Sequence, residues 1–498
     1  MYAPIIKEIF FWRKKRLDTA SQQFELYQEI LLGKIISQNL STRYLKNFGI
    51  RNVESFRQNC DAVHYDDIEP QILKIKNEHV NELCSEKIIA FSKSSGTTSR
   101  SKLLPMTKYS LKANFTAGKN MLSYYLSSNP SSNIIHGKNF SLTGSYHMEN
   151  GYVIGDVSAL FTYFLKPWYK PFRTPSKEIA TIADWDEKLR IMTPILSNED
   201  IRWIAGVPSW MSVVIDNIEN YTQRPIHKVW KNLEVYFYGG VNIAPLENYF
   251  TEKFNPNLQL WQTYNASEGF FGLQSENQNR QMILLQDTSN YYEFIDLSEI
   301  DNSHPTILNS REIEIGKIYE LVITNFSGLY RYRMGDLIEV SSSSPFKFNI
   351  IGRTKNYINV FGEELMVSNT EWAISRLSSE LDLSIQDYTI APIVMGNKGY
   401  HHWLIEFKNS PSDLTHFKLK LDEKLREINS DYDTKRYNNL ILQNLEIDTL
   451  PSGSFNQWLE INKRKNVQAK IPKLWKDRSI QLEIIELSKQ KEAYTSSL

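Results

Sequence analysis

A loop rich in hydroxyl side chains has the composition of a phosphate-binding site. It runs from Ser94 to Lys102 and reads Ser-Ser-Gly-Thr-Thr-Ser-Arg-Ser-Lys. In such a loop, backbone N–H groups and hydroxyls can turn onto a polyanion, and the lysine adds positive charge. It is not a Walker A loop, because no glycine immediately precedes the lysine, and a flexible Ser/Thr linker is the alternative interpretation. The candidate nucleotide contacts in this loop are Ser94, Ser95, Gly96, Thr97, Thr98 and Lys102.

A second candidate segment, Tyr264-Asn-Ala-Ser-Glu-Gly269, comes directly after an apolar run that predicts a strand. Tyr264 can flank an adenine ring, Ser267 can contact a phosphate, and Glu268 can hold Mg²⁺ against the phosphates. A simple strand-to-loop turn with a surface glutamate is the alternative. Paired glycines would lie beside this segment and let a flat base approach the backbone, so Gly240 and Val241 are further nucleotide candidates.

Two more segments carry groups that suit a ribose. Asp336 follows a glycine at the end of a predicted strand, in Tyr330-Arg-Tyr-Arg-Met-Gly-Asp336, and its carboxylate can accept from both ribose hydroxyls. Arg353 offers a planar fork of donors to ribose or phosphate. Exposed hairpins punctuated by glycine are the alternative interpretation of both segments.

Near the C-terminal end, Lys470 stands in the stretch Gln468-Ala-Lys-Ile-Pro472. A mobile lysine can neutralise charge that develops between an acyl carboxylate and an α-phosphate. Because residues 463–476 are basic throughout, a solvated surface is the alternative. The neighbouring histidines His401 and His402 predict no metal site, because adjacent residues do not share a helix face and no cluster of His, Asp or Glu surrounds them.

Strands and helices are predicted to alternate around these segments. Apolar runs predict strands at 87–91, 201–208, 233–238 and 258–264, and helical patterns follow at 111–125 and 209–218. The alternation favours a largely parallel α/β sheet with ligands beyond the carboxyl ends of its strands. We therefore expect the Ser94 loop to lie between a strand and a helix. By position alone, an acyl-acid pocket is expected at Val207, Trp210 and Gly239. From 291 to 340 the pattern becomes β-rich, which predicts a barrel-like antiparallel unit.

Composition limits the classes of partner. The 498 residues carry 57 Lys plus Arg and 57 Asp plus Glu, so the net charge predicts neither nucleic acid nor a membrane surface as partner. No apolar run reaches the length of a membrane span, and two cysteines provide neither a disulfide framework nor a cysteine-based metal site. We expect a cytoplasmic protein of two or three domains, with a surface or docking helix at its N-terminus. The oligomeric state is not predicted.

In order along the chain, these segments resemble the motifs of the adenylate-forming superfamily, which includes acyl-CoA synthetases, luciferases and the adenylation domains of peptide synthetases. Tyr330–Asp336 is similar, nearly letter for letter, to the auxin-responsive acyl acid amido synthetases and their bacterial relatives, a branch of that superfamily. The ending Gln468–Lys473 resembles the same branch and lacks the pattern Pro-x-Thr-x-x-Gly-Lys of most CoA ligases. Four positions depart from the superfamily's usual residues: Ser99, Ser101, Asn356 and Glu364.

The resemblance implies an enzyme that uses ATP and Mg²⁺, adenylates a small carboxylic acid and transfers the acyl group to the amine of an amino acid. It implies catalytic roles for Lys470 and Glu268, with Glu268 also as metal ligand, and a nucleotide contact at Ala266. The expected fold is α/β, with a large N-terminal domain (1–357) of helix-flanked sheets that includes the barrel-like subdomain. A small mobile α+β domain (358–498) follows and pivots near 353–362. An acyl-CoA ligase and a non-catalytic nucleotide-binding regulator on the same scaffold are the alternatives.

Overall fold

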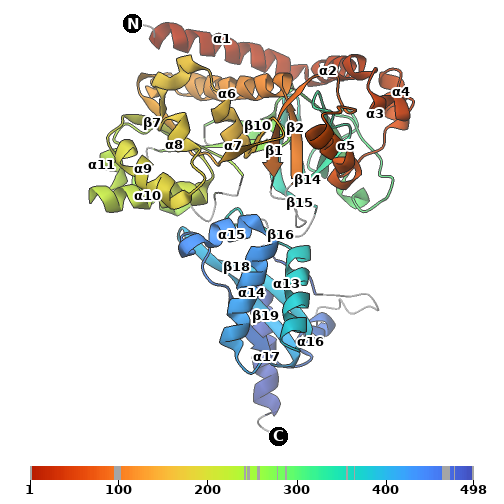
Figure 1. The fold of residues 1–498 in the computed structure, drawn as a ribbon, viewed down its shortest axis with the longest axis vertical. Helices are drawn as coiled ribbons and strands as arrows, with labels where there is room; N and C mark the ends of the chain where they lie inside the picture. Colours follow the sequence, from red (N-terminus) through yellow and green to blue (C-terminus); the bar gives the residue numbers. More distant parts are fainter. Residues whose placement is uncertain are drawn as a thin grey trace.

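The fold is described from a computed structural model, in which a large part and a smaller C-terminal part lie end to end (Figure 1). The structure describes residues 3–94, 102–240, 243, 247–254, 258–277, 279–286, 289–354, 357–363, 365–461, 471–475 and 477–495. Within these ranges, no helix combines the length and the apolar composition that crossing a bilayer requires.

Five helices open the chain: α1 (Ala3–Gln22), α2 (Phe24–Asn39), α3 (Arg43–Asn47), α4 (Val53–Asn59) and α5 (Tyr65–Glu78). Apolar residues that recur every three or four positions predict one long helix over 18–36, but the structure divides this stretch at Gln23, whose ψ of 34° is not helical. Helix α2 packs against the later strands, with Phe24, Leu32 and Ile35 almost fully buried. Helix α1 lies along α6 (Lys108–Ser128) at the top of Figure 1.

A small sheet contains the strands on both sides of the Ser94 loop. Its order is β2-β1-β5-β4, with bounds β1 (Ile88–Ser94), β2 (Lys102–Thr107), β4 (Tyr146–Glu149) and β5 (Tyr152–Gly155). The loop therefore joins two antiparallel strands, and the prediction that it leads directly into a helix is wrong. Strand β2 includes Pro105, which an edge strand tolerates because its outer N–H groups need no partner. Helix α6 begins only after Thr107, whose side chain caps it by accepting from the N–H of Ser110.

The described strands also form one 11-stranded sheet, whose order is β12-β13-β14-β15-β11-β10-β9-β8-β7-β3-β6. Its last five strands are parallel, as predicted: β9 (Gln259–Ala266), β8 (Val235–Tyr238), β7 (Ile201–Gly206), β3 (Lys138–Ser141) and β6 (Arg173–Thr174). The other strands are antiparallel: β10 (Gly269–Glu276), β11 (Asn279–Leu284), β12 (Asn290–Asp296), β13 (Ile318–Asn325), β14 (Tyr332–Ser343) and β15 (Phe346–Arg353). The β-rich region is thus continuous with the parallel strands.

Helices cover the parallel strands on both faces. On one face α6 packs its buried Ala117, Met121 and Tyr125 against Phe237 and Trp261 of the sheet. The other helices of the large part are α7 (Val157–Tyr163), α8 (Lys177–Ala180), α9 (Trp185–Ser197), α10 (Pro208–Thr222), α11 (Ile226–Val229) and α12 (Glu247–Phe254). Short 3-10 helices are η1 (Ile134–His136), η2 (Pro167–Phe172) and η4 (Leu297–Glu299).

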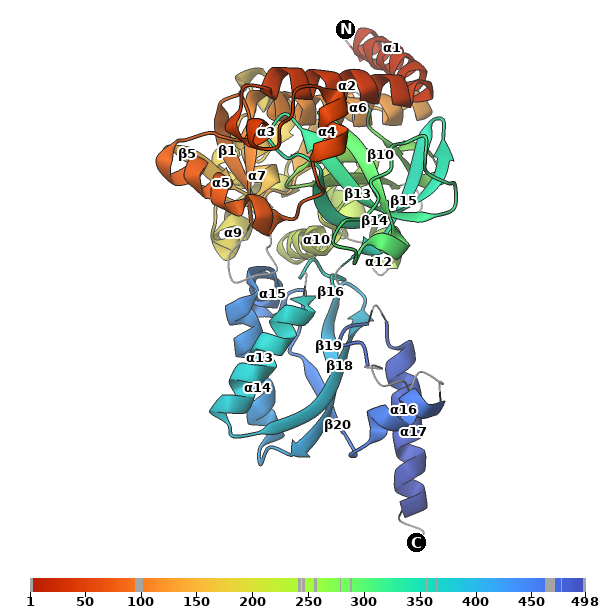
Figure 2. The same ribbon diagram turned by 90° about the vertical axis from the view of Figure 1, so that its right-hand side faces the viewer.

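The C-terminal part is built on a three-stranded sheet, in the order β18 (Ser384–Met395), β19 (Lys398–Asn409) and β20 (Glu446–Leu450). Helices α13 (Val367–Glu380) and α14 (Leu414–Ile428) lie on one face, and α16 (Ser454–Ile461) and α17 (Ser479–Thr495) on the other (Figure 2). Alternation along β19 serves both faces, because Trp403 belongs to one core and Leu404 to the other. The remaining elements are β16 (Tyr357–Ile358), β17 (Leu365–Met366), α15 (Ser430–Arg436) and η5 (Tyr437–Asn439).

Candidate active site

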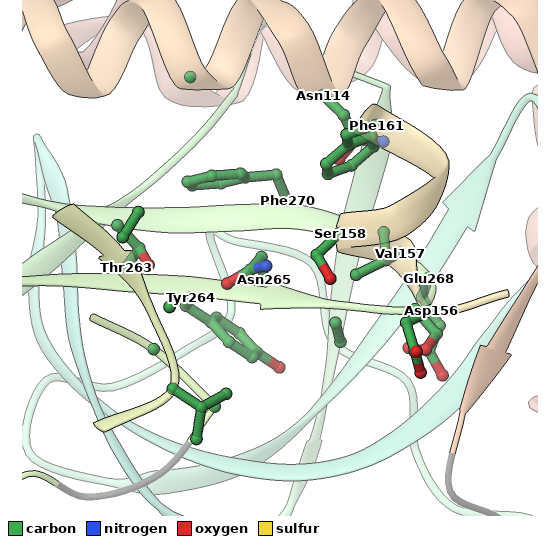
Figure 3. A pocket seen from close by; sticks show the side chains of 18 of the residues that line it. Asn114, Asp156, Val157, Ser158, Phe161, Thr263, Tyr264, Asn265, Glu268 and Phe270 are labelled. Atoms are coloured by element: carbon green, nitrogen blue, oxygen red, sulfur yellow. The ribbon is translucent and has the colours of Figure 1, made fainter. Parts of the chain in front are cut away.

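A cavity of about 1670 Å³ opens at the carboxyl ends of the parallel strands. One wall is the sheet, through Phe237, Gly239 and Thr263, and the opposite wall is α6 (Figure 3). The α6 residues that line it include Leu111, Phe115, Gly118 and Leu122, whose spacing in the sequence predicts that they share one face of a helix. The lining continues onto Asp431, Leu474 and Trp475 of the C-terminal part. The cavity therefore lies where the two parts meet.

Two side chains hold the carboxylate of Asp336 on the wall of this cavity. Tyr264 donates from its hydroxyl to Asp336 Oδ2 at 2.5 Å, and Arg353 Nε lies 2.5 Å from Asp336 Oδ1. Asp336 and Arg353 are cross-strand neighbours of β14 and β15. A bulge in β14 turns the backbone here, with Gly335 at a φ of 76°, where glycine meets no steric penalty. Each carboxylate oxygen keeps a second lone pair, so Asp336 can still accept from a ligand.

Tyr264 lies behind Asp336, with its ring buried. It packs against Phe271 at 5.1 Å and Phe348 at 6.0 Å between ring centroids. Burial, with Asp336 next in effect, raises the pKa of Tyr264 far above its ordinary value, so the hydroxyl remains a donor at neutral pH. In this arrangement Tyr264 orients Asp336. Its expected contact with adenine stays a prediction.

The two arginines of the Tyr330–Asp336 motif form buried ion pairs in the sheet. Arg331 pairs with Glu293 at 2.8 Å and also donates to the backbone carbonyls of Arg57 and Cys60. Arg333 pairs with Glu320, whose other oxygen accepts from the N–H of Gly335 at 3.1 Å. These pairs fix the backbone on both sides of the bulge. The motif therefore positions Asp336 through its neighbours.

Glu268 lines the same cavity, half-buried at the turn between β9 and β10. Burial raises the pKa of Glu268, and the positive charge of Arg353 opposes that rise. Its neighbour Ser267 donates to the carbonyl of Lys93 at 3.2 Å, which ties the turn to the end of β1. Lys102 also lines the cavity, with Nζ 5.5 Å from the ring centre of Tyr65. In the described residues, no three His, Cys, Asp or Glu side chains are grouped to hold a metal ion.

The expected acyl-pocket residues separate into two places. Val207 and Gly239 line the cavity, and so do Gly240 and Ala266 from the nucleotide candidates. A Cβ on Gly239 would lie 2.7 Å from the carbonyl oxygen of Thr263, so only glycine fits there. Trp210 is not among the lining residues. It packs on the first turn of α10 at 4.4 Å from the ring of Trp185, with Lys435 Nζ 4.6 Å from its ring centre. It therefore faces α9 and the C-terminal part.

Several predicted contacts lie outside the described residues: Ser95, Gly96, Thr97, Thr98, Val241 and Lys470. Ser94 is described as the last residue of β1. The roles predicted for all of these remain predictions.

Three polar residues near the cavity have no sequence motif that marks them. Asp156 lines it and accepts from the N–H of Ser145 at 3.0 Å. Lys188 is buried beneath the same turn, where it donates to the carbonyl of Thr143 at 3.0 Å, and burial lowers the pKa of its ammonium group to about 8. Arg173 lines the cavity from β6. All three depend on segments distant in sequence, so no local pattern could have found them.

The adjacent histidines have separate partners in the C-terminal part. His401 Nε2 lies 2.8 Å from Glu363 Oε1, and both side chains are fully buried. His402 lies between Gln481 and Asp448, 3.1 Å from each. The pair therefore packs β19 against its surroundings on both faces.

Models of three consecutive domains of one family match this chain: the GH3 family N-terminal domain over 13–259, the central domain over 283–353 and the C-terminal domain over 368–479. This chain belongs to the GH3 family. The family predicted from the motifs is thereby confirmed.

Individual relatives of this GH3 chain have low sequence identity to it, but they match it over nearly its whole length. The indole-3-acetic acid-amido synthetase GH3.3 of Arabidopsis thaliana is 22% identical in an alignment 544 residues long, gaps included. The alignment covers 92% of this chain and 90% of that protein. The solved structure of AtGH3.15 acyl acid amido synthetase in complex with 2,4-DB matches with a TM-score of 0.63 at 18% identity, over 98% of this chain and 97% of the other. The 2-hydroxyisobutyryl-CoA ligase in its thioesterification state gives 0.55 at 12% identity, over 95% and 92%. The GH3 chain shares the fold of both.

Proposed function

We propose that this chain is an ATP-dependent acyl acid amido synthetase. The observation that carries the proposal is one continuous cavity with two kinds of lining. Asp336, Glu268 and Arg353 line it with the charges that suit a nucleotide, and α6 lines it with apolar side chains that suit the body of an organic acid. Membership of the GH3 family and the amido synthetases among the relatives support the same activity.

In the first half-reaction, a carboxylate oxygen of the acid attacks the α-phosphorus of ATP, and the bond to pyrophosphate breaks. Asp336 would accept from the ribose hydroxyls while Tyr264 and Arg353 hold it in place. Lys102 and the Ser94–Thr98 loop would bind phosphate oxygens, with Ser267 and Ala266 beside them. Positive groups aimed at the α-phosphate stabilise the charge that develops in the transition state.

Mg²⁺ would bind between Glu268 and the phosphates. The ion is commonly held by one or two protein carboxylates together with substrate oxygens, so a single glutamate suffices. The setting of Glu268 fits this role, because a cation would stabilise the ionised form that burial disfavours. Mg²⁺ would supply charge neutralisation at the phosphates.

In the second half-reaction, the amine nitrogen attacks the acyl carbonyl carbon, the bond to AMP breaks, and the nitrogen loses a proton to a base.

Lys470 is proposed as the lysine that neutralises charge at the carboxylate and α-phosphate during adenylation. Lys470→Ala should slow ATP–pyrophosphate exchange much more than it weakens ATP binding. Exchange at the wild-type rate would favour the alternative interpretation, in which Lys470 is a solvated surface lysine.

The parts 1–357 and 358–498 are proposed as domains that pivot near 353–362. Polar contacts join them at their adjoining ends, where Asn397 Nδ2 donates to Asp216 Oδ2 at 2.7 Å and Tyr437 donates to Asp186. The first contact is half-buried and the second is exposed, and polar contacts of this kind are exchanged for water at modest cost, which permits rotation between half-reactions. Equal interdomain distances by paired spin labels with an acyl-AMP analogue and with AMP plus an amino acid would contradict the pivot.

One experiment tests the function. The protein, placed by this proposal in the cytoplasm, is mixed with ATP, Mg²⁺ and a library of aromatic and aliphatic acids, and acid-dependent pyrophosphate exchange is scored. The best acid is then offered CoA or pooled amino acids, and products are identified by mass spectrometry. We expect an N-acyl amino acid. An acyl-CoA product alone would favour the CoA ligase, whose fold is shared, and absence of exchange with every acid would favour a nucleotide-binding regulator.

A further inference from the structure

Arg173 is a buried cation on the wall of the cavity. Its side chain belongs to β6, at the edge of the 11-stranded sheet, and only 9% of the residue is exposed. Within the part of the chain that the structure describes, its side chain makes one hydrogen bond, from Nη1 to the hydroxyl of Thr162 on α7 at 2.8 Å. Nε and Nη2 are buried, and neither has a hydrogen-bond partner among the described residues. Most of the binding capacity of this guanidinium is therefore unused.

No carboxylate of the described residues forms an ion pair with Arg173, which separates it from the other buried arginines. Arg331, Arg333 and Arg436 each face a buried glutamate or aspartate within the fold. Burial lowers the pKa of Arg173 to about 10, so the group remains cationic at neutral pH. A buried charge with unmet donors costs folding free energy, and a ligand anion is the usual compensation at a binding site.

The sheet register places Arg173 at the far end of the acyl chamber. Arg173 pairs with Asn139 of β3, and Asn139 pairs with Trp203 of β7, so these three side chains share one face of a parallel sheet. Trp203 belongs to the hydrophobic core that α6 covers. Four strand-to-strand steps separate β6 from β9, which carries Tyr264, or roughly 19 Å. A ligand that reaches Arg173 from the nucleotide end must pass between α6 and the sheet.

The chamber between these ends is mainly apolar. Its lining includes Phe115 and Leu122 of α6, Phe161 of α7, and Ala205 and Phe237 of the sheet. Figure 3 shows Phe161 and Phe270 on the side of the cavity next to α6. Where the chamber meets solvent, the exposed lysines Lys112, Lys119 and Lys166 line it, and none of them forms an ion pair with a described residue. These cations would favour the entry of an acid with more than one negative charge.

We propose that Arg173 binds a second carboxylate, so that this enzyme adenylates dicarboxylic acids with an apolar body. One carboxylate would lie at the α-phosphate of ATP, and the other would accept from Nε and Nη2 of Arg173 in the two-bond geometry that carboxylates make with arginine. Thr162 orients the guanidinium by accepting from Nη1. The inference rests on the proposed function and names the class of its acid.

The test compares matched linear acids that share one body: octanoic with octanedioic acid, dodecanoic with dodecanedioic acid, and a ladder of α,ω-diacids whose longer members span the chamber to Arg173. ATP–pyrophosphate exchange without any amine gives kcat/KM for each acid. We expect the wild type to prefer the diacid of a pair, and the ratio of diacid to monoacid kcat/KM to fall roughly 10- to 100-fold in Arg173→Met. Arg173→Lys should recover part of the ratio, because it restores the charge without the planar fork. Octanedioic acid should raise the melting temperature of the wild type and not that of Arg173→Met.

Arg202→Met is the matched control, because Arg202 is on β7 one residue from Trp203 but pairs with Asp200 outside the cavity. Its diacid preference should equal that of the wild type. Equal use of monoacids and diacids by the wild type would overturn the inference and leave the proposed function intact. The amino acid substrate also carries a carboxylate that Arg173 could bind. If Arg173→Met keeps the wild-type diacid preference in ATP–pyrophosphate exchange but has a raised KM for the amino acid, the inference is overturned and Arg173 belongs to the amino acid site. Absence of exchange with every acid would overturn the proposed function and this inference together.

Discussion

Removing one hydroxyl, in Tyr264→Phe, tests whether Asp336 depends on its neighbours for its position. The phenol donates to Asp336 Oδ2, and only 5% of the Asp336 residue is exposed, so water cannot easily replace the lost donor. A hydrogen bond to a charged group contributes about 1.5–3 kcal/mol, which corresponds to a roughly 10- to 100-fold loss in kcat/KM for ATP. Phenylalanine fills the same space against Phe271 and Phe348, so the fold should persist.

The assay is ATP–pyrophosphate exchange at a saturating concentration of the best acid, with ATP varied. Tyr292→Phe is the matched control, since it also removes a buried hydroxyl donor. The hydroxyl of Tyr292 donates to the carbonyl of Leu285 at 3.1 Å, and neither residue lines the cavity. We expect wild-type nucleotide kinetics from the control. If Tyr264→Phe and Tyr292→Phe behave alike, the positioning of Asp336 by Tyr264 is refuted.

Three further changes test the scaffold around the site. Arg331→Met leaves Glu293 buried without its cation and should lower the free energy of unfolding by about 3–5 kcal/mol in urea titrations, whereas adding Glu293→Leu should recover part of the loss; equal stability of wild type and single variant would contradict this. Between about pH 8 and about pH 10.5 the unfolded chain binds more protons at Lys188 than the folded chain. Over this range the free energy of unfolding should therefore rise by about 2–3 kcal/mol more in the wild type than in Lys188→Met. Parallel pH profiles of the two proteins would show that Lys188 titrates normally. Gly239→Ala places a Cβ against Thr263 and should raise the KM for the acid several-fold or more, as exchange kinetics would show; an unchanged KM would mean that the strand end yields freely.

Sequence patterns predicted the parallel strands and their alternation with helices because these features depend on local periodicity. The strand ends at Gly206, Tyr238 and Ala266 follow apolar runs, and parallel strands bring such ends to one edge. Asp336 and Arg353 also could be associated in advance, since a hairpin of two consecutive strands pairs them.

Other features depend on contacts that no local pattern encodes. Strand β2 was hidden by Pro105, which is acceptable only because tertiary pairing places β2 at a sheet edge. Trp210 was assigned by its distance from a strand end, but the first turn of α10 directs it towards Trp185. Arg173 reaches the cavity wall through the parallel pairing of β3 and β6, which places it beside Asn139, 34 positions earlier in the sequence.

The docking of α2 onto late strands has a consequence for synthesis of the chain. Gln28 bonds the N–H of Tyr292 across 264 positions, and Phe24 packs at 4.9 Å from Phe346. At ribosomal rates of about 5–20 residues per second, the apolar face of α2 emerges roughly 15–50 s before its partners exist. During that interval it must be held by chaperones or by non-native contacts.

The boundary of the family's N-terminal domain at residue 259 is therefore not a folding boundary. A nascent chain stalled there would expose both the face of α2 and the edge of β8, whose partner β9 begins only at Gln259, and both surfaces promote aggregation. Productive folding of the large part requires β15, which ends at Arg353, so the pairing of Asp336 with Arg353 is completed at the same stage of translation as the folded core.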